Sequence, residues 1–478
     1  MAKCAFGKVL LRGTFEPEWK FGTELYARMF YVENDHTKSL LVALDTSCTG
    51  HHDCTRFRQG VAAKTGIPAD CIWYHELQIH AAPECRHLAG KAMDNIIDRV
   101  SDEANAMMER AVPFTCDVCH ADLGTRFSMN REQYVEGLGG VTIWAGMRFD
   151  EDGKPYCNDP GRMLLRGYTP DLPVFEKPIY FDNTVDSKAY LFVFRDETGA
   201  VIGTMSRFAA HPDVSVLFES KGIHDHHYDY DWPGYLTEKL EAQYQAPSMY
   251  VNGPCADLAT KKGWDGMDDY LTSTAESKRI GEALADELIS QFDRKHIPMQ
   301  NTDFVRATTF TVELPMRDTY PHSFAELPET LEIAARREAA LQKGIEDNLP
   351  AYAVKRLIDD RWREGHSSHS VRNACRFEEE ELIRRSVETT VAVLQLGDYL
   401  FIGVPGECLV DMTMWLRSTF TGAKTIPLDQ VNGYYNYMAT PRSLTLGGYT
   451  YWASWVRRDA VPILKEKILQ FMENWLDA

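Results

Sequence analysis

The sequence predicts an α/β protein in which mixed β-sheets are flanked by helices. Short apolar runs of strand length alternate with longer segments whose apolar residues recur every three or four positions. Hydrophobic residues make up 44% of the chain and charged residues 25%, which is typical of a globular protein. Because no repeat, low-complexity tract or linker divides the chain, we expect residues 1–478 to form a single domain, with a weak signal for a lobe boundary near residues 300–320.

Seven apolar runs have the length and residue types of strands. Several are apolar nearly throughout, as is typical of strands that are covered on both faces. A further strand is expected around residues 71–73. The seven predicted strands span residues 39–45, 189–195, 200–206, 247–252, 304–314, 389–397 and 399–405.

Amphipathic segments between these runs predict helices. They span residues 86–111, 269–294, 327–343 and 460–476. Another helix is expected to begin at Asp231, because Pro233 then lies just inside its first turn. The sequence 404–408 ends a strand and is expected to open a helix, with Glu407 on its first turn, where unpaired N–H groups favour an anion.

The net charge is −19, from 70 acidic and 51 basic side chains. Such a surface repels nucleic acids and anionic lipid headgroups, and no run of Lys and Arg offsets it. No apolar run reaches the about 18 residues that a membrane span needs. Lys8, Arg12 and Glu16 interrupt the first apolar stretch, which is unlike a signal-peptide core. We therefore expect a cytoplasmic protein with mostly free thiols that binds neither nucleic acid nor membrane.

Cys116, Cys119 and His120 form the pattern C-x-x-C-H, which is the attachment signature of c-type haem. Haem attachment normally requires export, which the N-terminal residues do not predict. A zinc knuckle would need a second Cys or His pair nearby, and the following residues contain none. We therefore expect two buried thiols in a loop.

Four segments place ionisable or aromatic side chains at the ends of predicted strands. The first, residues 74–83, is close to H-E-x-x-H, but Ile79 stands at the second His position and His80 follows it, so a zinc-binding helix of that type is rejected. In the second, His211 precedes a proline, which suits a rigidly held imidazole, although an isolated loop histidine is more often without a ligand. Residues 224–231, rich in His and Asp, suit a metal or a solvated loop equally well.

The third segment contains Glu407, and the fourth is aromatic. Residues 433–437 and 447–452 hold five tyrosines and a tryptophan among glycines and turn residues. Such rings either fill a core or line a pocket.

Taken in order, these segments resemble the catalytic domain of the neutral, non-lysosomal ceramidases, a family of zinc-dependent amide hydrolases. The family motif Val-Pro-Gly-Glu is present unchanged at 404–407, and Ala210-His211-Pro212 is similar to its Val-His-Pro. The resemblance runs from Asp45 to about Trp452. The other similar segments are Leu77-Gln78-Ile79-His80-Ala81-Ala82-Pro83 for Thr-His-Thr-His-Ser-Gly-Pro, Asn130-Arg131 for Asn-Arg, Asp231-Trp232-Pro233-Gly234-Tyr235 for Asp-Asn-Lys-Gly-Tyr, and Tyr437 with Tyr449 for two tyrosines twelve positions apart.

The resemblance implies a ceramidase-like fold and a zinc ion held by His211, Glu407 and Tyr437. It also implies that His80, Arg131 and Tyr449 surround the scissile amide. Asp231, Asp257, Tyr435 and Trp452 are the predicted substrate-binding residues.

Three departures from the family pattern change this expectation. Gln78 stands where the family has a histidine ligand, so the site is expected to bind zinc more weakly or to favour another divalent ion. Ala259 replaces a serine in the segment 252–259, so hydrolysis is expected to use metal-activated water. The family's C-terminal immunoglobulin-like domain and secretion signal have no counterpart in the sequence, which speaks against action on membrane-presented ceramide.

The sequence therefore predicts a metal-dependent hydrolase that cleaves an amide or related C–N bond of a small soluble substrate. Self-association as a homo-oligomer stays open. One alternative is a non-catalytic or differently catalytic protein that binds a small molecule in the same cleft, and another is a true ceramide or lipid amidase. Retention of His211, Glu407 and Arg131 favours the enzyme, because burying such polar groups without a function is costly.

Overall fold

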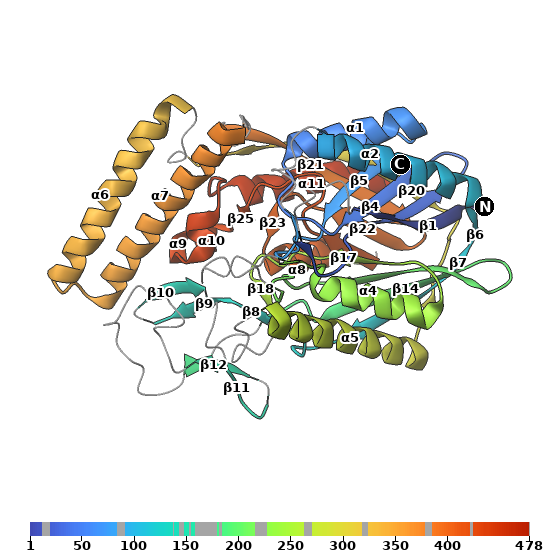
Figure 1. The fold of residues 1–478 in the computed structure, drawn as a ribbon, viewed down its shortest axis with the longest axis horizontal. Coiled ribbons are helices and arrows are strands. Elements are labelled where there is room, and N and C mark those ends of the chain that lie inside the picture. The colour runs from blue at the N-terminus through green and yellow to red at the C-terminus, as the bar shows by residue number, and fades with distance from the viewer. Residues whose placement is uncertain are drawn as a thin grey trace. The chain divides into compact units, whose positions relative to one another are not determined.

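A computed structural model gives the fold in Figure 1. No helix in the described part of the chain is both long enough and apolar enough to cross a membrane. The structure describes residues 1–11, 20–83, 91–136, 138–142, 148–152, 154–157, 179–180, 184–215, 227–261, 270–317, 324–377, 385–420 and 424–477.

The prediction of an α/β fold with mixed sheets is confirmed. Two five-stranded sheets form its centre, and each combines antiparallel pairs with a single parallel pair, β4–β5 in the first and β15–β17 in the second. In order across the first sheet lie β5 (Ile72–Glu76), β4 (Lys38–Leu44), β3 (Tyr26–Glu33), β1 (Lys3–Leu10) and β6 (Val112–Pro113). The second contains β17 (Ser248–Asn252), β15 (Val201–Phe208), β14 (Lys188–Arg195), β7 (Thr115–Asp122) and β19 (Ile297–Pro298).

The two sheets pack face to face between two pairs of helices (Figure 1). The rings of Phe6, Phe30 and Phe194 meet between the sheets with centroids 4.9 to 5.2 Å apart. The outer face of the first sheet is covered by α1 (His51–Thr65) and α2 (Lys91–Arg110), and that of the second by α4 (Asp231–Tyr244) and α5 (Tyr270–Arg294). Strands buried on both faces explain why their sequences are continuously apolar.

A third sheet contains the strand that leads to Glu407. Its order is β20 (Val305–Pro315), β21 (Ser386–Leu396), β22 (Tyr399–Gly403) and β24 (Lys424–Leu428). The short elements that lie outside these three sheets and the four helices that cover the first two include β2 (Lys20–Phe21), η1 (Ala69–Cys71), β16 (His227–Tyr228), β18 (Leu258–Thr260), β23 (Glu407–Cys408) and α8 (Val410–Thr419).

The chain divides into two compact units, each built from three segments. Unit 1 comprises Met1–Ser128, Asp186–Thr311 and Thr390–Tyr434, and it contains the paired five-stranded sheets. Unit 2 comprises Met129–Val185, Val312–Thr389 and Tyr435–Ala478. The chain crosses between the units five times, once at 311–312, and a single domain over residues 1–478 stays a prediction.

Unit 2 is built mainly from helices. Its longest helices, α6 (Leu327–Glu346) and α7 (Ala351–Phe377), pack on each other through Leu341, Val354 and Ile358. Its other elements are β8 (Ser128–Asn130, begun in unit 1), β9 (Glu132–Val135), β10 (Gly139–Thr142), β11 (Arg148–Phe149), β12 (Pro155–Cys157), β13 (Ile179–Tyr180), η4 (Phe324–Glu326), β25 (Tyr437–Met438), α9 (Pro441–Leu446), α10 (Tyr449–Ala453) and α11 (Ala460–Asp477).

Two local expectations were wrong. Cys116 and Cys119 are buried free thiols, but they lie in β7 and not in a loop, and the imidazole of His120 in the same strand is 2.6 Å from the Tyr399 hydroxyl. Glu407 precedes α8 in the short strand β23, so it does not lie on the first helical turn. The expected helix start at Asp231 is confirmed.

Candidate functional site

His211 of unit 1 lies just after β15, and hydrogen bonds fix its main chain. Its N–H donates to the carbonyl of Leu258 (2.9 Å). Its own carbonyl accepts hydrogen bonds from Thr260 Oγ1 (2.6 Å) and Trp232 Nε1 (3.4 Å). Pro212 restricts the backbone on the other side. These contacts fix the position from which the imidazole projects, and the side chain is completely buried.

The hydrogen bond at Nδ1 of His211 settles which ring nitrogen is available. Nδ1 is 2.8 Å from the carbonyl oxygen of Cys255, and a carbonyl can only accept. Nδ1 therefore carries the proton in the neutral ring, and Nε2 keeps its lone pair. A ring oriented in this way by a carbonyl is the usual arrangement of a metal-binding histidine.

Glu407 presents its carboxylate to that nitrogen. Its Oε2 is 3.5 Å from His211 Nε2, and both side chains are almost completely buried. Tyr434 donates a hydrogen bond to Oε1 over 3.0 Å. Gly406, with φ of 65°, adopts the left-handed conformation that the turn into β23 requires, and its N–H donates to Gly433.

The spacing of this pair fits two ligands of one divalent ion. Zinc bonds of 2.0–2.2 Å at a tetrahedral angle would place the two donor atoms about 3.4 Å apart. The observed 3.5 Å agrees with that distance and is long for a direct hydrogen bond. Within the described ranges, however, no three side chains of His, Cys, Asp or Glu gather at one metal position. A third ligand from the chain would therefore have to be of another type.

Gln78 and His80 lie on a turn that is hydrogen-bonded to the residue after His211. The N–H of His80 donates to the carbonyl of Pro212 (3.0 Å), and the rings of His80 and His211 are 5.4 Å apart. Gln78 is buried, has a φ of 56°, and its Oε1 has no hydrogen-bond partner among the described residues. A strained residue with an unsatisfied buried oxygen is typical of a functional position. His80, in contrast, is exposed.

Asp231 and Asp257 are occupied by main-chain groups of unit 1. Asp231 Oδ2 accepts the N–H groups of Val214 (2.9 Å) and Ser215 (3.0 Å), so it holds the loop that follows His211. Asp257 Oδ1 accepts the N–H of Val410 (2.7 Å) at the start of α8. Both carboxylates are buried. Both carboxylates therefore stabilise the local backbone through these hydrogen bonds. Substrate binding by Asp231 and Asp257 stays a prediction.

Two more buried carboxylates lie near these groups. Burial, with Asp231 as a neighbour, raises the pKa of Asp229 to about 6. Burial also raises the pKa of Asp429 well above its usual value, and the nearby Glu407 adds to this effect. Asp429 accepts the N–H group of Cys408 (3.0 Å), the residue after Glu407. It also accepts the N–H group of Cys255 (3.4 Å), the residue whose carbonyl orients His211. Of the segment 224–231, residues 224–226 lie outside the described residues.

Unit 2 contains a second group of predicted site residues. The buried Arg131 donates from Nη2 to the hydroxyl of Tyr437 over 2.6 Å. Tyr437 contacts Tyr449 edge to face at 4.9 Å, and Tyr449 contacts Trp452 at 4.2 Å. Trp452 stacks on Trp362 of α7 at 5.3 Å. The result is a continuous row of four aromatic rings that begins at the Arg131–Tyr437 pair.

Tyr435 lies elsewhere in unit 2, where its hydroxyl donates to the carbonyl of Glu388. Sequence reasoning missed Trp362, because no helix was predicted over residues 351–377. It also missed the role of Cys255, because the contact is made by the main-chain carbonyl, which every residue type has. Asp429 was missed because its contact with Cys408 joins residues 21 positions apart. Tyr434 belongs to the predicted aromatic segment, but its hydrogen bond to Glu407, 27 positions away, was not predicted.

The arrangement of elements is similar to that of two proteins of known structure. A neutral ceramidase from Pseudomonas aeruginosa superposes with a TM-score of 0.60 at 13% identity, over 96% of this chain and 72% of that chain. The chain has the fold of the neutral ceramidases. A second structure, a ceramidase complexed with C2, gives a TM-score of 0.61 at 12% identity over 96% and 73% of the two chains. No family model matches the sequence. No curated protein sequence matches it either. At this identity the similarity concerns the fold.

Proposed function

We propose that the protein is a metal-dependent hydrolase that cleaves an amide or related C–N bond of a small soluble substrate. The observation that carries the proposal is the spacing of 3.5 Å between His211 Nε2 and Glu407 Oε2, combined with the Cys255 carbonyl on His211 Nδ1. The fold shared with ceramidases supports the class of reaction.

His211 and Glu407 would hold the ion, and Gln78 offers an amide oxygen from the neighbouring turn. When bound, a divalent ion such as zinc polarises a carbonyl group and acidifies a water molecule. His80 is the residue placed to exchange protons, because its exposed imidazole adjoins the buried His211. With alanine at position 259, we assign the attack on the carbonyl to water. The roles of Arg131, Tyr437 and Tyr449 are proposed from the resemblance alone.

The proposed substrate is a water-soluble amide, and no membrane or nucleic-acid partner is proposed. A charge of −19 disfavours docking on anionic surfaces. Aromatic rings such as Trp452 suit a flat or ring-containing substrate group. A cytoplasmic location is also proposed, because the described cysteines carry free thiols, as is usual in a reducing compartment.

A second candidate is a protein that binds a small molecule on the same scaffold without hydrolysing it. Gln78 and Ala259 favour it, because each replaces a side chain with more reactive chemistry in the resembling family. A true ceramide amidase is the third candidate, favoured by the shared fold.

An activity screen separates the three candidates. Purified protein with added zinc is assayed against short soluble N-acyl amides and against long-chain ceramide in micelles, together with the variants His211→Ala and Glu407→Gln. His36→Ala, which removes an exposed histidine from the turn between β3 and β4, is the matched control. We expect hydrolysis of a soluble amide that both site variants abolish and the control retains. Comparable ceramide hydrolysis would indicate the lipid amidase, and no hydrolysis would favour the binding protein.

A further inference from the structure

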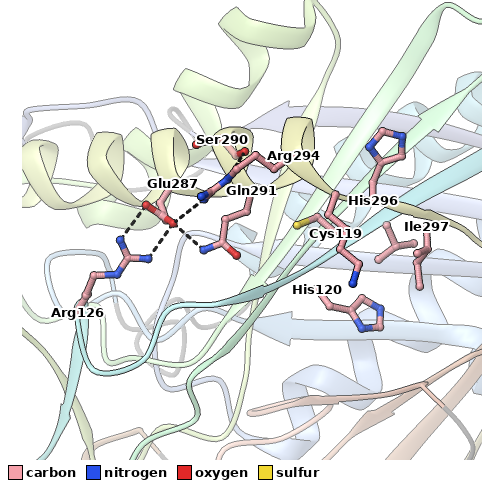
Figure 2. A pocket seen from close by; sticks show the side chains of 11 residues that line it. Cys119, His120, Arg126, Glu287, Ser290, Gln291, Arg294, His296 and Ile297 are labelled. Atoms are coloured by element: carbon pink, nitrogen blue, oxygen red, sulfur yellow. Dashed lines mark hydrogen bonds and ion pairs between the residues drawn. The ribbon is translucent and has the colours of Figure 1, made fainter.

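A pocket lies in unit 1 at the edge of the second sheet, between β7 and the C-terminal end of α5 (Figure 2). Its volume is about 810 Å³. Its walls come from β7, the turn after it, α5 and β19, and they contain no residue of the candidate site described above. An inference drawn from it is therefore independent of the proposed function.

The pocket covers a short stretch of β7 that the outermost strand, β19, leaves unpaired. Only two residues of β19 pair with this edge, with Ile297 opposite Val118. Further along the strand, Asp122 exchanges two hydrogen bonds with the Gln291 side chain (3.3 and 3.4 Å). N–H groups of alternate residues point to the same edge of a strand. The main-chain N–H of His120 therefore points to the pocket between Ile297 and Gln291.

The side chains around the pocket are mainly cationic. Three basic residues, Arg126, Arg294 and Lys295, line it together with one acidic residue, Glu287, which gives a net charge of 3 − 1 = +2. This charge is opposite in sign to the −19 of the whole chain. An anion that reaches this surface is therefore attracted to the pocket.

Glu287 does not neutralise the pocket, because its carboxylate is already bound. Arg126 holds it with two contacts of 2.9 and 2.8 Å, and Gln291 donates to it over 2.6 Å (Figure 2). The hydrogen bond from Arg126 is the main cause that lowers the pKa of Glu287 to about 2. Arg294 lies farther from the carboxylate, at 3.7 Å, and Lys295 has no acidic partner among the described residues.

Stabilisation of a helix end explains part of this arrangement. Arg294 and Lys295 are in or directly after the last turn of α5, where cations are favoured by the exposed carbonyl groups. That effect does not account for Arg126, which comes from the turn after β7, or for the main-chain donor at the open edge. These groups converge on one pocket from separate segments of the chain.

We propose that this pocket binds the phosphate or carboxylate group of a small organic anion. Arg294 and Lys295 supply the charge, and the N–H of His120 supplies a directed donor, as oxyanion sites commonly combine them. Val118 and Ile297 provide an apolar surface for the rest of the molecule. The site is separate from the proposed catalytic group, because no residue of that group lines the pocket.

Calorimetric titration at constant ionic strength tests the proposal with three probes: inorganic phosphate, phenyl phosphate and acetate. The pocket variant is Arg294→Gln with Lys295→Gln. The matched control is Lys278→Gln with Arg279→Gln, which removes the same charge from exposed positions of the same helix, where the two residues pair with Glu282 and Glu276.

We expect the native protein to bind one of the phosphates or acetate, the pocket variant to bind it at least about tenfold more weakly, and the control to change by less than about twofold. Tighter binding of phenyl phosphate than of inorganic phosphate would support the role of the apolar surface, and binding of acetate alone would select carboxylates. Retained binding in His211→Ala would locate the anion away from the candidate site. No binding of any probe to native protein, or equal weakening in pocket variant and control, would overturn the proposal.

Discussion

The hydroxyl of Tyr434 is predicted to set the strength of metal binding at Glu407. It donates to Glu407 Oε1 over 3.0 Å inside the protein, where the carboxylate cannot find water as a substitute. Tyr434→Phe removes this donor and keeps the ring. A hydrogen bond to a charged group contributes about 1.5–3 kcal/mol, which corresponds to roughly 10- to 150-fold in a binding constant. Loss of such a supporting contact typically lowers metal affinity about 10- to 100-fold.

Competition with a fluorescent zinc chelator measures this change directly. The control is Tyr435→Phe, which removes the neighbouring hydroxyl, whose partner is the main-chain carbonyl of Glu388. We expect weaker zinc binding only in Tyr434→Phe, with the circular dichroism of both variants unchanged. Equal zinc affinity in Tyr434→Phe and native protein would refute the reasoning, because Glu407 could then not be a ligand oriented by this bond.

Three further predictions follow from the same contacts. Gln78→His should raise zinc affinity in the chelator assay, because imidazole binds zinc better than an amide oxygen; unchanged affinity would mean that Gln78 is not a ligand. His80→Ala should lower kcat for a soluble amide by about 10²- to 10⁴-fold while bound zinc stays constant, and a parallel loss of metal would contradict a role in proton transfer. The raised pKa of Asp229, about 6 against 3.8, means that the folded state binds the proton more tightly, so stability falls as pH rises from about 4 to 6, by roughly 3 kcal/mol for this group. Chemical denaturation at several pH values should show a flatter profile for Asp229→Asn, and an unchanged profile would assign the titration to another group.

Much of the layered fold was predictable because strands buried on both faces leave a continuous apolar signal. Residues 39–45, 189–195 and 399–405 were found in this way and correspond to β4, β14 and β22. The strand β1 was missed, since Gly7 and Lys8 interrupt its apolar run. The helix α7 was missed because its apolar residues show little helical periodicity, so its partner Trp362 was missed with it.

The candidate site was predictable only where side-chain identity carries the chemistry. His211 and Glu407 could be named from short motifs, but their distance depends on contacts distant in sequence. The Cys255 carbonyl orients His211 from 44 positions away. Glu407 was expected on a helix because Pro405 and Gly406 resemble a helix start, whereas the backbone first forms a short strand and α8 begins at Val410. Local sequence does not encode such tertiary hydrogen bonds.

Elemental analysis of the protein purified without chelators tests the central claim most directly. Native protein and the double variant His211→Ala with Glu407→Ala are prepared in parallel and measured by plasma mass spectrometry. The account predicts about one equivalent of zinc, or of another divalent ion, per native chain and none in a folded double variant. Equal metal content in both, or a metal-free native protein that hydrolyses amides at full rate, would contradict it.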